Sequence, residues 1–252
     1  YVGYYRGSFP VAAYHGLSDA YARRMQVLVD GVSVYSPLYG GVEWAELPVF
    51  IQDIERIEVV RGSNAVSYGA NAFLAVINII TRDPATEPHV QAALNIGESG
   101  IRDVVARVAQ HGDDWRYRIS LGQRNDDRFT NIPDNSRITL ANLRAHYQLN
   151  PVDELSFQMR ASRGMESAGF FEISNGDVGT PHPRDISQST LQMRWTHAQS
   201  ADDEFWVQAS HHEQNPREVD NFFLRLPNFP PIPYGINYNY DLKRDDIEFQ
   251  QL

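Results

Sequence analysis

The sequence predicts a small α+β domain followed by antiparallel strands of the up-and-down barrel type. Residues 1 to about 86 mix apolar runs with stretches suited to short helices. From Pro88 onward, segments of roughly ten residues alternate apolar and polar side chains, and a tilted strand needs about that length to cross a bilayer. The links between these segments alternate in length, which would place short links on one rim and long links on the other.

The first half contains a tight hairpin. The apolar run Met25–Val29 is followed by Asp30 and Gly31, which suit the positive φ of a two-residue turn, and then by a second alternating run. Pro48 suits the first turn of a short helix. The other expected elements are strands at 54–60 and 76–81 and a second short helix at 63–74, capped by Ser63 or Asn64.

The second half repeats one pattern. Trp115, Tyr117 and Ile119 alternate with Arg116 and Arg118. A soluble sandwich also alternates, because it has water outside and a dry core inside, so alternation alone leaves both architectures open. The expected strands are 90–96, 104–108, 115–121, 141–149, 155–161, 191–195, 205–209 and, more weakly, 247–249.

Link length favours the barrel over the sandwich. A Greek-key sandwich has no reason to sort its loops by length, whereas an up-and-down barrel places every second link on the same rim. The long links hold most of the later prolines, which lack a ladder donor, so we expect them to be loops and candidates for binding. After a first short link at 98–100 the lengths alternate: the short links are 111–114, 150–153 and 200–203, and the long ones are 123–136, 163–186 and 212–242.

The composition argues against several classes of function. A net charge of −10 and no basic cluster longer than Arg23-Arg24 argue against a nucleic-acid partner. The absence of cysteine excludes thiol nucleophiles and cysteine-type zinc sites. We expect no cofactor and no metal site, since the adjacent His211 and His212 would point to opposite faces of a strand. No Ser, His or Asp stands in a recognised catalytic context, so no enzyme is expected.

Three stretches together resemble a known family. They are "YYRG", "RRMQVLVDGVSVY" and "DIERIEVVRGSNAVSYGANAFLAVINIITRDP". Their order from about Tyr5 to Pro84 is similar to the plug domain of TonB-dependent outer-membrane receptors. Two mild departures are Ser63, where the family usually has proline after Arg-Gly, and Leu74-Ala75-Val76, where it often has glycine.

The resemblance implies an α+β plug domain followed by antiparallel transmembrane β-barrel strands in an incomplete barrel. Residues 1–86 would be a plug lacking its N-terminal part, and residues 87–252 the first eight or so of the family's 22 strands. The implied function is energised uptake of a scarce solute, such as a ferric siderophore or cobalamin, across a Gram-negative outer membrane. The implied partners are a TonB-type energy-transducing protein, reached through a missing N-terminal segment, an extracellular small solute such as an iron chelate, and outer-membrane lipid.

The resemblance also suggests ligand-contacting residues. In this family the segment after the second hairpin strand rises toward the extracellular side of the plug. Aromatic rings there would offer stiff contact surface, and hydroxyl or carboxylate groups would orient a polar solute. The alternative is that Tyr35 and Trp44 only pack the plug against the wall. The candidates are Tyr35, Ser36, Leu38, Tyr39, Val42, Glu43 and Trp44.

Arginines have two expected roles. Arg6 and Arg61, each before a glycine, match family arginines that lock the plug to barrel carboxylates, which should lie beyond Leu252; the alternative is an ordinary surface arginine. Polar side chains of the barrel wall would either bind an acidic solute or form salt bridges with plug acids such as Glu55 and Glu58. These wall residues are Arg116, Arg118, Arg144, Gln158, Arg160 and Arg194.

Two other functions remain open from the residues alone. One is a soluble β-rich carbohydrate-binding or adhesion domain, in which the Trp115 and Phe157 face would be buried within the same chain. The other is an all-β hydrolase, which needs carboxylates converging in a cleft. Its only candidate cluster, Asp126, Asp127 and Asp134, lies in one loop.

Overall fold

The computed structural model describes residues 2–5, 9–12, 22–63, 68, 71–127, 135–168, 182–200, 203–224 and 229–251. Its first part is a four-stranded sheet in the order β4-β3-β6-β5, in which β3 and β6 are parallel. The strands are β3 (Met25–Val29), β4 (Val32–Ser33), β5 (Ile54–Arg61) and β6 (Ala75–Thr81), and a separate hairpin joins β1 (Val2–Tyr5) to β2 (Phe9–Ala12).

The Asp-Gly hairpin forms as the sequence predicts. Asp30 and Gly31 both have positive φ, at 51° and 82°, in the turn between β3 and β4. The Asp30 carboxylate accepts hydrogen bonds from the backbone N–H of Thr81 (2.8 Å) and from its hydroxyl (2.9 Å). These bonds tie the turn to the end of β6.

A short 3₁₀ turn takes the place of the helix expected after Pro48. After Pro48 the chain makes one turn, η2 (Ile51–Asp53), and most of the helix expected at 63–74 lies outside the described residues. The turn η2 ends at Asp53, whose side chain contacts Arg107 of the large sheet. None of the helical turns in the described residues has the length or apolarity of a membrane span. The other turns are η1 (Trp44–Glu46) and η3 (Pro84–Thr86).

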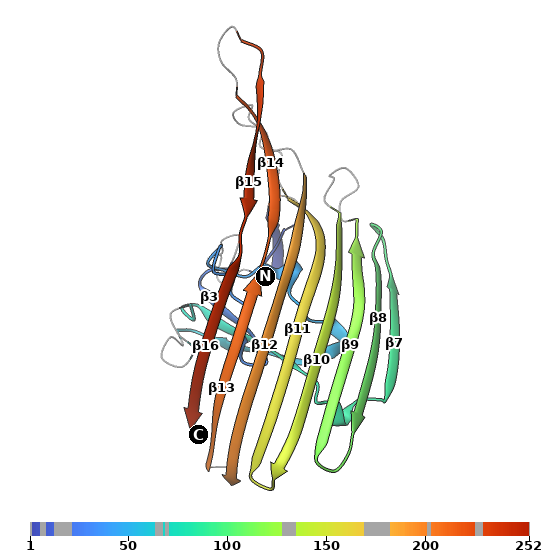
Figure 1. The fold of residues 1–252 in the computed structure, drawn as a ribbon, viewed down its shortest axis with the longest axis vertical. Helices are drawn as coiled ribbons and strands as arrows, with labels where there is room; N and C mark the ends of the chain where they lie inside the picture. Colours follow the sequence, from blue (N-terminus) through green and yellow to red (C-terminus); the bar gives the residue numbers. More distant parts are fainter. Residues whose placement is uncertain are drawn as a thin grey trace.

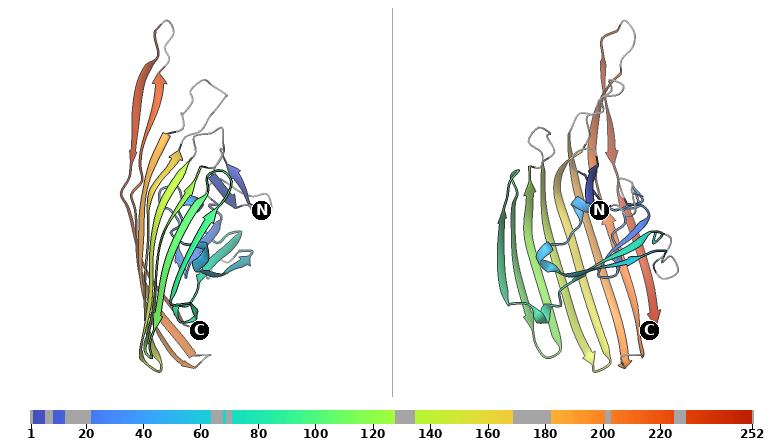
Figure 2. Two further views of the ribbon diagram at one scale, coloured as in Figure 1. Left: turned by 90° about the vertical axis from the view of Figure 1, so that its right-hand side faces the viewer. Right: turned by 180° about the vertical axis from the view of Figure 1, so that it is seen from behind.

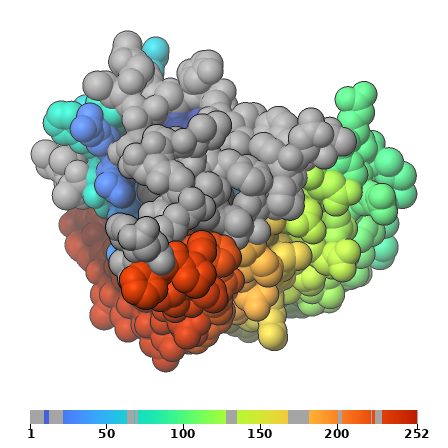
Figure 3. Space-filling view, turned by 90° about the horizontal axis from the view of Figure 1, so that it is seen from above, coloured from blue at the N-terminus to red at the C-terminus, as the bar shows by residue number. Residues whose placement is uncertain are grey.

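The second part is one large antiparallel sheet (Figure 1). Consecutive strands pair with each other from β7 to β13, and β16 pairs with β13. Seen from above, the sheet runs as a wall from the green strands to the red C-terminal ones (Figure 3). The strands are β7 (Val90–Ile96), β8 (Arg102–His111), β9 (Trp115–Asp126), β10 (Ser136–Asn150), β11 (Asp153–Ala168), β12 (His182–Ser200), β13 (Asp203–Gln214) and β16 (Leu242–Gln251).

The long links contain more strand than predicted. β11 and β12 run well into the expected loop at 163–186, and the expected loop at 212–242 contains a hairpin of β14 (Arg217–Leu224) and β15 (Ile232–Asn239). The loop prediction for these segments was therefore wrong in part. Pro233 is tolerated because, among the described residues, β15 pairs only with β14 and so leaves one edge that needs no donor.

The large sheet is apolar outside and polar inside. Outward side chains of the middle strands, such as Ile119 (41%) and Leu121 (54%), are exposed, whereas the inward Arg118 (3%) and Ser120 (0%) are buried. The first domain lies against the concave, polar face (Figure 2). The soluble-domain alternative requires the apolar stripes to meet in a dry interior, and these exposed stripes do not favour it. Other outward apolar side chains are Phe157, Met159, Leu191, Met193, Val207 and Ile247.

One apolar contact interrupts the polar inner face. Phe50, which precedes η2, is 3% exposed and packs against Val105, Ile138, Leu140 and Ile186 of the wall. Gly122 on β9 makes room for this ring, because a Cβ added there would lie 2.9 Å from the Phe50 side chain and 2.2 Å from a backbone oxygen. Phe50 is thus an apolar anchor between the two parts of the chain.

The outward and inward faces of β9 can be tested with lipid-dissolved quenchers. The chain itself has no cysteine, so, once any cysteines elsewhere in the receptor are replaced, a label can be placed on Ile119→Cys or Ser120→Cys in the whole receptor reconstituted in vesicles. We expect a fluorescent label at position 119 to be quenched by a lipid-dissolved quencher and one at 120 to be protected. Equal quenching at the two positions would contradict the assignment of faces.

Because Phe50 is an anchor and its neighbour Ile51 is not, alanine substitutions at the two positions should differ in their effect on stability. Phe50→Ala should lower the free energy of unfolding of the receptor in detergent by about 3–5 kcal/mol, because it empties a well-packed site. Its neighbour Ile51, which is 79% exposed, provides the control, and Ile51→Ala should stay within about 0.5 kcal/mol. Urea unfolding measures both, and similar losses in the two variants would refute the anchor.

Candidate functional site

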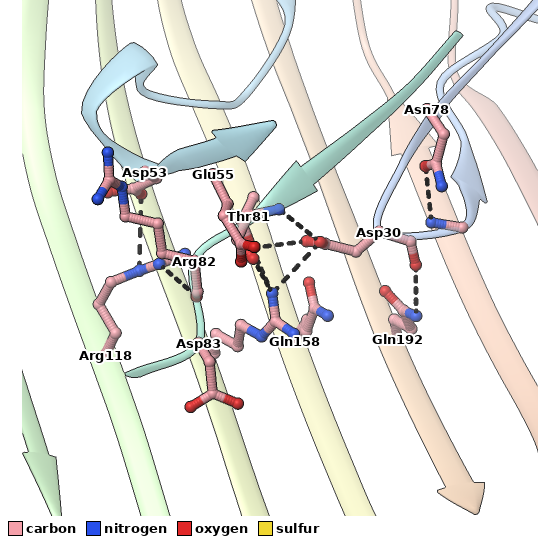
Figure 4. A network of polar contacts seen from close by, with 12 residues as sticks. Asp30, Asp53, Glu55, Asn78, Thr81, Arg82, Asp83, Arg118, Gln158 and Gln192 are labelled. Carbon is pink, nitrogen blue, oxygen red and sulfur yellow. Dashed lines mark hydrogen bonds and ion pairs between the residues drawn. The ribbon is translucent and has the colours of Figure 1, made fainter. Parts of the chain in front are cut away.

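The candidate site is the interface between the first domain and the concave face of the large sheet. Side chains from the domain carry mainly carboxylates to it, and the wall supplies guanidinium groups. They gather in three places, which we call the Asp53, Asp30 and Arg184 clusters. Figure 4 shows parts of the first two from close by, with Asp53 beside Arg118 and with Asp30 between Thr81 and Gln192.

The Asp53 cluster consists of Asp53, Glu87, Arg107, Arg118 and Ser120. Arg107 on β8 pairs with Asp53 and, at 2.7 Å, with Glu87. Arg118 on β9 lies 2.9 Å from Glu87 and 3.8 Å from Asp53. The Ser120 hydroxyl donates to Asp53 at 3.1 Å. Two carboxylates thus face two guanidinium groups, and all four side chains are at most 5% exposed, so the charges balance without water.

The Asp30 cluster joins the hairpin turn to β10, β11 and β12. Arg144 donates to the Thr81 carbonyl (2.8 Å) and hydroxyl (2.6 Å), and its Nη1 lies 3.3 Å from Asp30. Arg160 approaches the other Asp30 oxygen at 3.4 Å. The Asp30 carbonyl accepts from Gln192 at 3.4 Å. The turn that the sequence predicts is therefore also a docking point on the wall.

The Arg184 cluster has an excess of carboxylates. The Arg184 guanidinium on β12 lies 2.6 Å from Glu43, 3.0 Å from Glu46 and 3.4 Å from Glu166. Its centre lies 5.3 Å from the ring centroid of Tyr39, within the range of a cation–π contact. Three acids for one buried cation leave unbalanced negative charge.

Protonation of Glu46 relieves this excess. Burial of Glu46 and repulsion from Glu43 raise its pKa well above the ordinary value of 4.5, although Arg184 pulls in the other direction. A protonated Glu46 can donate a hydrogen bond to Glu43, which raises the pKa further. Arg184 then faces the charges of Glu43 and Glu166, with the Glu218 carboxylate farther off at 3.9 Å.

The predicted ligand-contacting residues divide into two groups. Tyr35 (8%) and Val42 (1%) lie in the core of the first domain, where the Tyr35 hydroxyl donates to the Arg23 carbonyl at 2.6 Å. Trp44 is partly buried against the same core. Ser36 (3%) is also buried, but its hydroxyl reaches across to Gln214 of β13 at 2.8 Å.

The other members of the predicted set lie nearer the wall or solvent. Glu43 pairs with Arg184 and accepts a hydrogen bond from Gln214, so it connects the domain to β12 and β13. Leu38 and Tyr39 are half-buried. The structure therefore brings Ser36, Tyr39 and Glu43 together at the wall.

Among the described residues, the structure shows no ion pair for the arginines that were predicted to lock the plug to the wall. Arg6 lies outside the described residues. Arg61 is exposed at the end of β5 and has no ion pair with the residues that the structure describes. Glu55 and Glu58, expected as possible plug partners of the wall, instead pair with Arg56 on the surface.

Sequence reasoning identified the wall side of the site better than the domain side. Arg118, Arg144 and Arg160 face the interface as expected from alternation. Five other residues of the interface were not predicted as site residues, although one of them, Asp30, was predicted as a turn residue. They are Asp30, Asp53, Glu87, Arg107 and Arg184. The strand period could have found Arg107 and Arg184, because they share the inner face with Arg118 across the ladder.

The adjacent histidines lie on opposite faces of β13. His212 is 5% exposed and bonds to Thr190 at 2.9 Å inside the sheet, whereas His211 pairs with Asp245 at 2.6 Å on the outside. In the part of the chain that the structure describes, no three His, Asp or Glu side chains are placed to hold a metal ion.

A cavity separates part of the domain from the wall. It has a volume of about 950 Å³ and lies between β3 and β6 on one side and β10 to β13 on the other. Its lining is mixed in charge and largely polar, and includes Asn78, Arg144, Glu154, Gln192 and Arg194. A hydrated solute fits such a lining better than an apolar one.

Comparison with known proteins agrees with this architecture. Residues 2–76 match the family model described as the TonB-dependent receptor plug domain. A vitamin B12 transporter of Photobacterium profundum is 31% identical over 110 residues, which is 43% of this chain and 18% of that protein. The iron-regulated outer membrane virulence protein of Vibrio cholerae is 24% identical over 233 residues, or 82% of this chain and 34% of the relative.

Solved structures share the fold. The pyoverdine receptor of Pseudomonas aeruginosa in complex with a heterologous ferric pyoverdine aligns with 99% of this chain and 35% of its own, at a TM-score of 0.72 and 14% identity. The ferric-catecholate import receptor of Escherichia coli, in its open form, aligns with 92% of this chain and 39% of its own, at a TM-score of 0.66 and 14% identity.

These findings identify the chain as part of a TonB-dependent receptor, with a plug domain joined to an open antiparallel sheet of receptor strands. The family consists of receptors and transporters rather than enzymes. Its members place the protein in the outer membrane of a Gram-negative bacterium. The chain spans only 18% of the B12 transporter that it matches.

The raised pKa of Glu46 predicts a pH dependence. Between its ordinary and its raised value, the folded plug holds a proton that the unfolded chain has released. The free energy of unfolding should therefore fall as the pH rises above 4.5, by at most about 1.4 kcal/mol per pH unit. Glu46→Gln should remove this slope, measured as thermal midpoints of the whole receptor across the pH range.

The exposed Glu55 supplies the control for this titration. Its side chain is 47% exposed and pairs only with Arg56 on the surface. Glu55→Gln should keep the wild-type slope. If Glu46→Gln and Glu55→Gln gave the same pH profile as the wild type, Glu46 would not be the titrating group.

Proposed function

We propose that the receptor carrying this chain takes up a scarce solute, such as a ferric siderophore or cobalamin, with energy from a TonB-type protein. The observation that carries the proposal is the docking of the plug on a polar concave face whose reverse side is apolar and exposed. The names of the relatives, a vitamin B12 transporter and an iron-regulated outer membrane protein, support the solute class. In this proposal residues 1–86 act as the plug and residues 87–252 as wall strands.

The nature of the plug–wall contacts suits a plug that must move. Buried ion pairs lose hydration when they form and regain it when they separate in water, so their net stabilisation is modest despite short distances. An interface of the same size made of apolar side chains would oppose hydration at every step of opening. The Asp53, Asp30 and Arg184 clusters would therefore hold the plug while allowing an applied force to release it.

The segment around Tyr39 is proposed to meet the solute. Leu38 and Tyr39 keep accessible surface and would contact the solute directly. Glu43 would transmit the effect of this contact to the wall through its ion pair with Arg184. Tyr35, Ser36, Val42 and Trp44 would hold this segment in shape. Uptake on this scheme needs binding and displacement only, so no enzymatic step is included.

The remaining partners are also part of the proposal. Arg6 and Arg61 would pair with carboxylates of the wall beyond Leu252, which accounts for the exposure of Arg61 in this chain. The TonB-type protein would engage a segment that precedes the plug. No role for nucleic acid is included, in keeping with the net charge of −10.

A deletion strain tests the proposal. Removing the receptor gene should abolish growth on one class of solute in a panel of ferric chelates as sole iron source and of limiting cobalamin in a cobalamin-requiring background. The intact gene should restore growth, and a Tyr39→Ala version should restore it only at higher solute concentration. Unchanged growth on every solute, or uptake that persists without the TonB-type protein, would refute the proposal.

A further inference from the structure

The outer face of the sheet changes from apolar to polar at nearly the same level on β9 to β12. Residues paired directly across an antiparallel ladder point to the same face, so each register row can be followed around the wall. The last apolar row is Leu121, Ala141 and Ala161 on β9 to β11, and on β12 the same row already holds Ser189, so the change comes one row lower there. The next two rows are Gln123, Thr139, Arg163 and Ser187, followed by Asn125, Arg137, Met165 and Asp185.

This level corresponds to a membrane boundary. The apolar rows below it hold exposed side chains such as Leu121, Met159 and Leu191, which require hydrocarbon around them. Polar and charged side chains immediately above an apolar band lie at the depth of lipid headgroups. Because the long links follow these strand ends, the boundary is the outer one.

A cavity of about 780 Å³ lies at this boundary on the outer face. It is built by β9 to β12 and by β14, which pairs with β12 only at two positions above the end of β13. Its lining includes Gln123, Asn125, Asp127, Asn135, Arg137, Thr139, Arg163, Asp185, Ser187, Asn215 and Arg217.

Three arginines bring positive charge to the lining of the cavity. Arg137 donates to Asn125, a neutral amide, at 3.2 Å, and Arg163 is exposed and has no carboxylate partner among the described residues. Arg217 pairs with Asp241. Two guanidinium groups are thus left for an external anion, and a planar guanidinium matches a phosphate in two-point contacts.

The other lining groups suit a sugar. The carboxylates of Asp127 and Asp185 can accept hydrogen bonds from hydroxyl groups, and the amides of Asn125, Asn135 and Asn215 can both donate and accept. Such a mixture of arginines, aspartates and amides would not be needed for a simple anion. It fits a ligand that carries phosphate and sugar together.

We propose that this cavity binds the phosphorylated sugar headgroup of an outer-leaflet glycolipid. The phosphates would contact Arg137 and Arg163, and the sugar hydroxyls would contact the aspartates and amides. The acyl chains would run down the wall over Leu121 and Met159, which lie on the same face one and two rows below Arg163. The inference rests on the outer-membrane location and is independent of the transported solute.

Lipid binding by the whole receptor tests this site. The probe is diphosphoryl lipid A in detergent micelles, with bound lipid measured by native mass spectrometry. The double variant R137Q/R163Q should bind about thirtyfold more weakly, since two surface arginines at about 1 kcal/mol each contribute about 2 kcal/mol to binding of an anionic headgroup. The control Lys243→Gln removes an equally outward-facing charge on β16, which is outside the cavity, and should change affinity less than about twofold.

Further measurements distinguish lipid binding from the binding of other anions and from loss of the fold. R137K/R163K should recover part of the affinity, and the thermal midpoint of R137Q/R163Q should match the wild type. Monophosphoryl lipid A should bind more weakly than the diphosphoryl form. Equal lipid binding by R137Q/R163Q and Lys243→Gln, no dependence on the number of phosphates, or displacement by millimolar inorganic phosphate would each overturn the proposal.

Discussion

A guanidinium on the inner face of the wall is removed from bulk water and has to find a carboxylate or another acceptor. Arg107 and Arg184 find carboxylates on the plug, Arg118 pairs with Glu87 directly after it, and leaving one of them unpaired would cost several kcal/mol. This constraint helps to fix where the plug sits, because Asp53 meets Arg107 and Glu43 meets Arg184 at two separate places on the wall. Phe50, an apolar anchor, then completes the docking without making it permanent.

The same chain faces two different solvents. Side chains that would form the core of a soluble sandwich point outward, and side chains that would normally be hydrated are buried against the plug. The outer face is stable only in hydrocarbon, and the inner face only with a plug or water beside it. A polar interior therefore suits both a tight closed state and an open state that water can fill, which the proposed uptake past a moving plug requires.

Strand alternation predicted much of this from the sequence. It found eight wall strands and the correct face for Ile119 and Arg118, and the Asp30-Gly31 pair predicted its turn. It did not find the hairpin at β14 and β15, because prolines argue against strands except at a free edge, and edges are a property of the sheet. The pairing of Asp53 with Arg107 also escaped, since it depends on the depth of the plug, which no local pattern encodes.

If the buried ion pairs hold the plug in place, plug and wall must be directly coupled in energy. A double-mutant cycle on Asp53→Asn and Arg107→Gln, followed by urea unfolding of the whole receptor, measures that coupling. We expect an interaction free energy of about 2 kcal/mol or more, because both side chains are buried and in contact. Additive effects, within about 0.3 kcal/mol, would show that the two groups do not hold the plug to the wall.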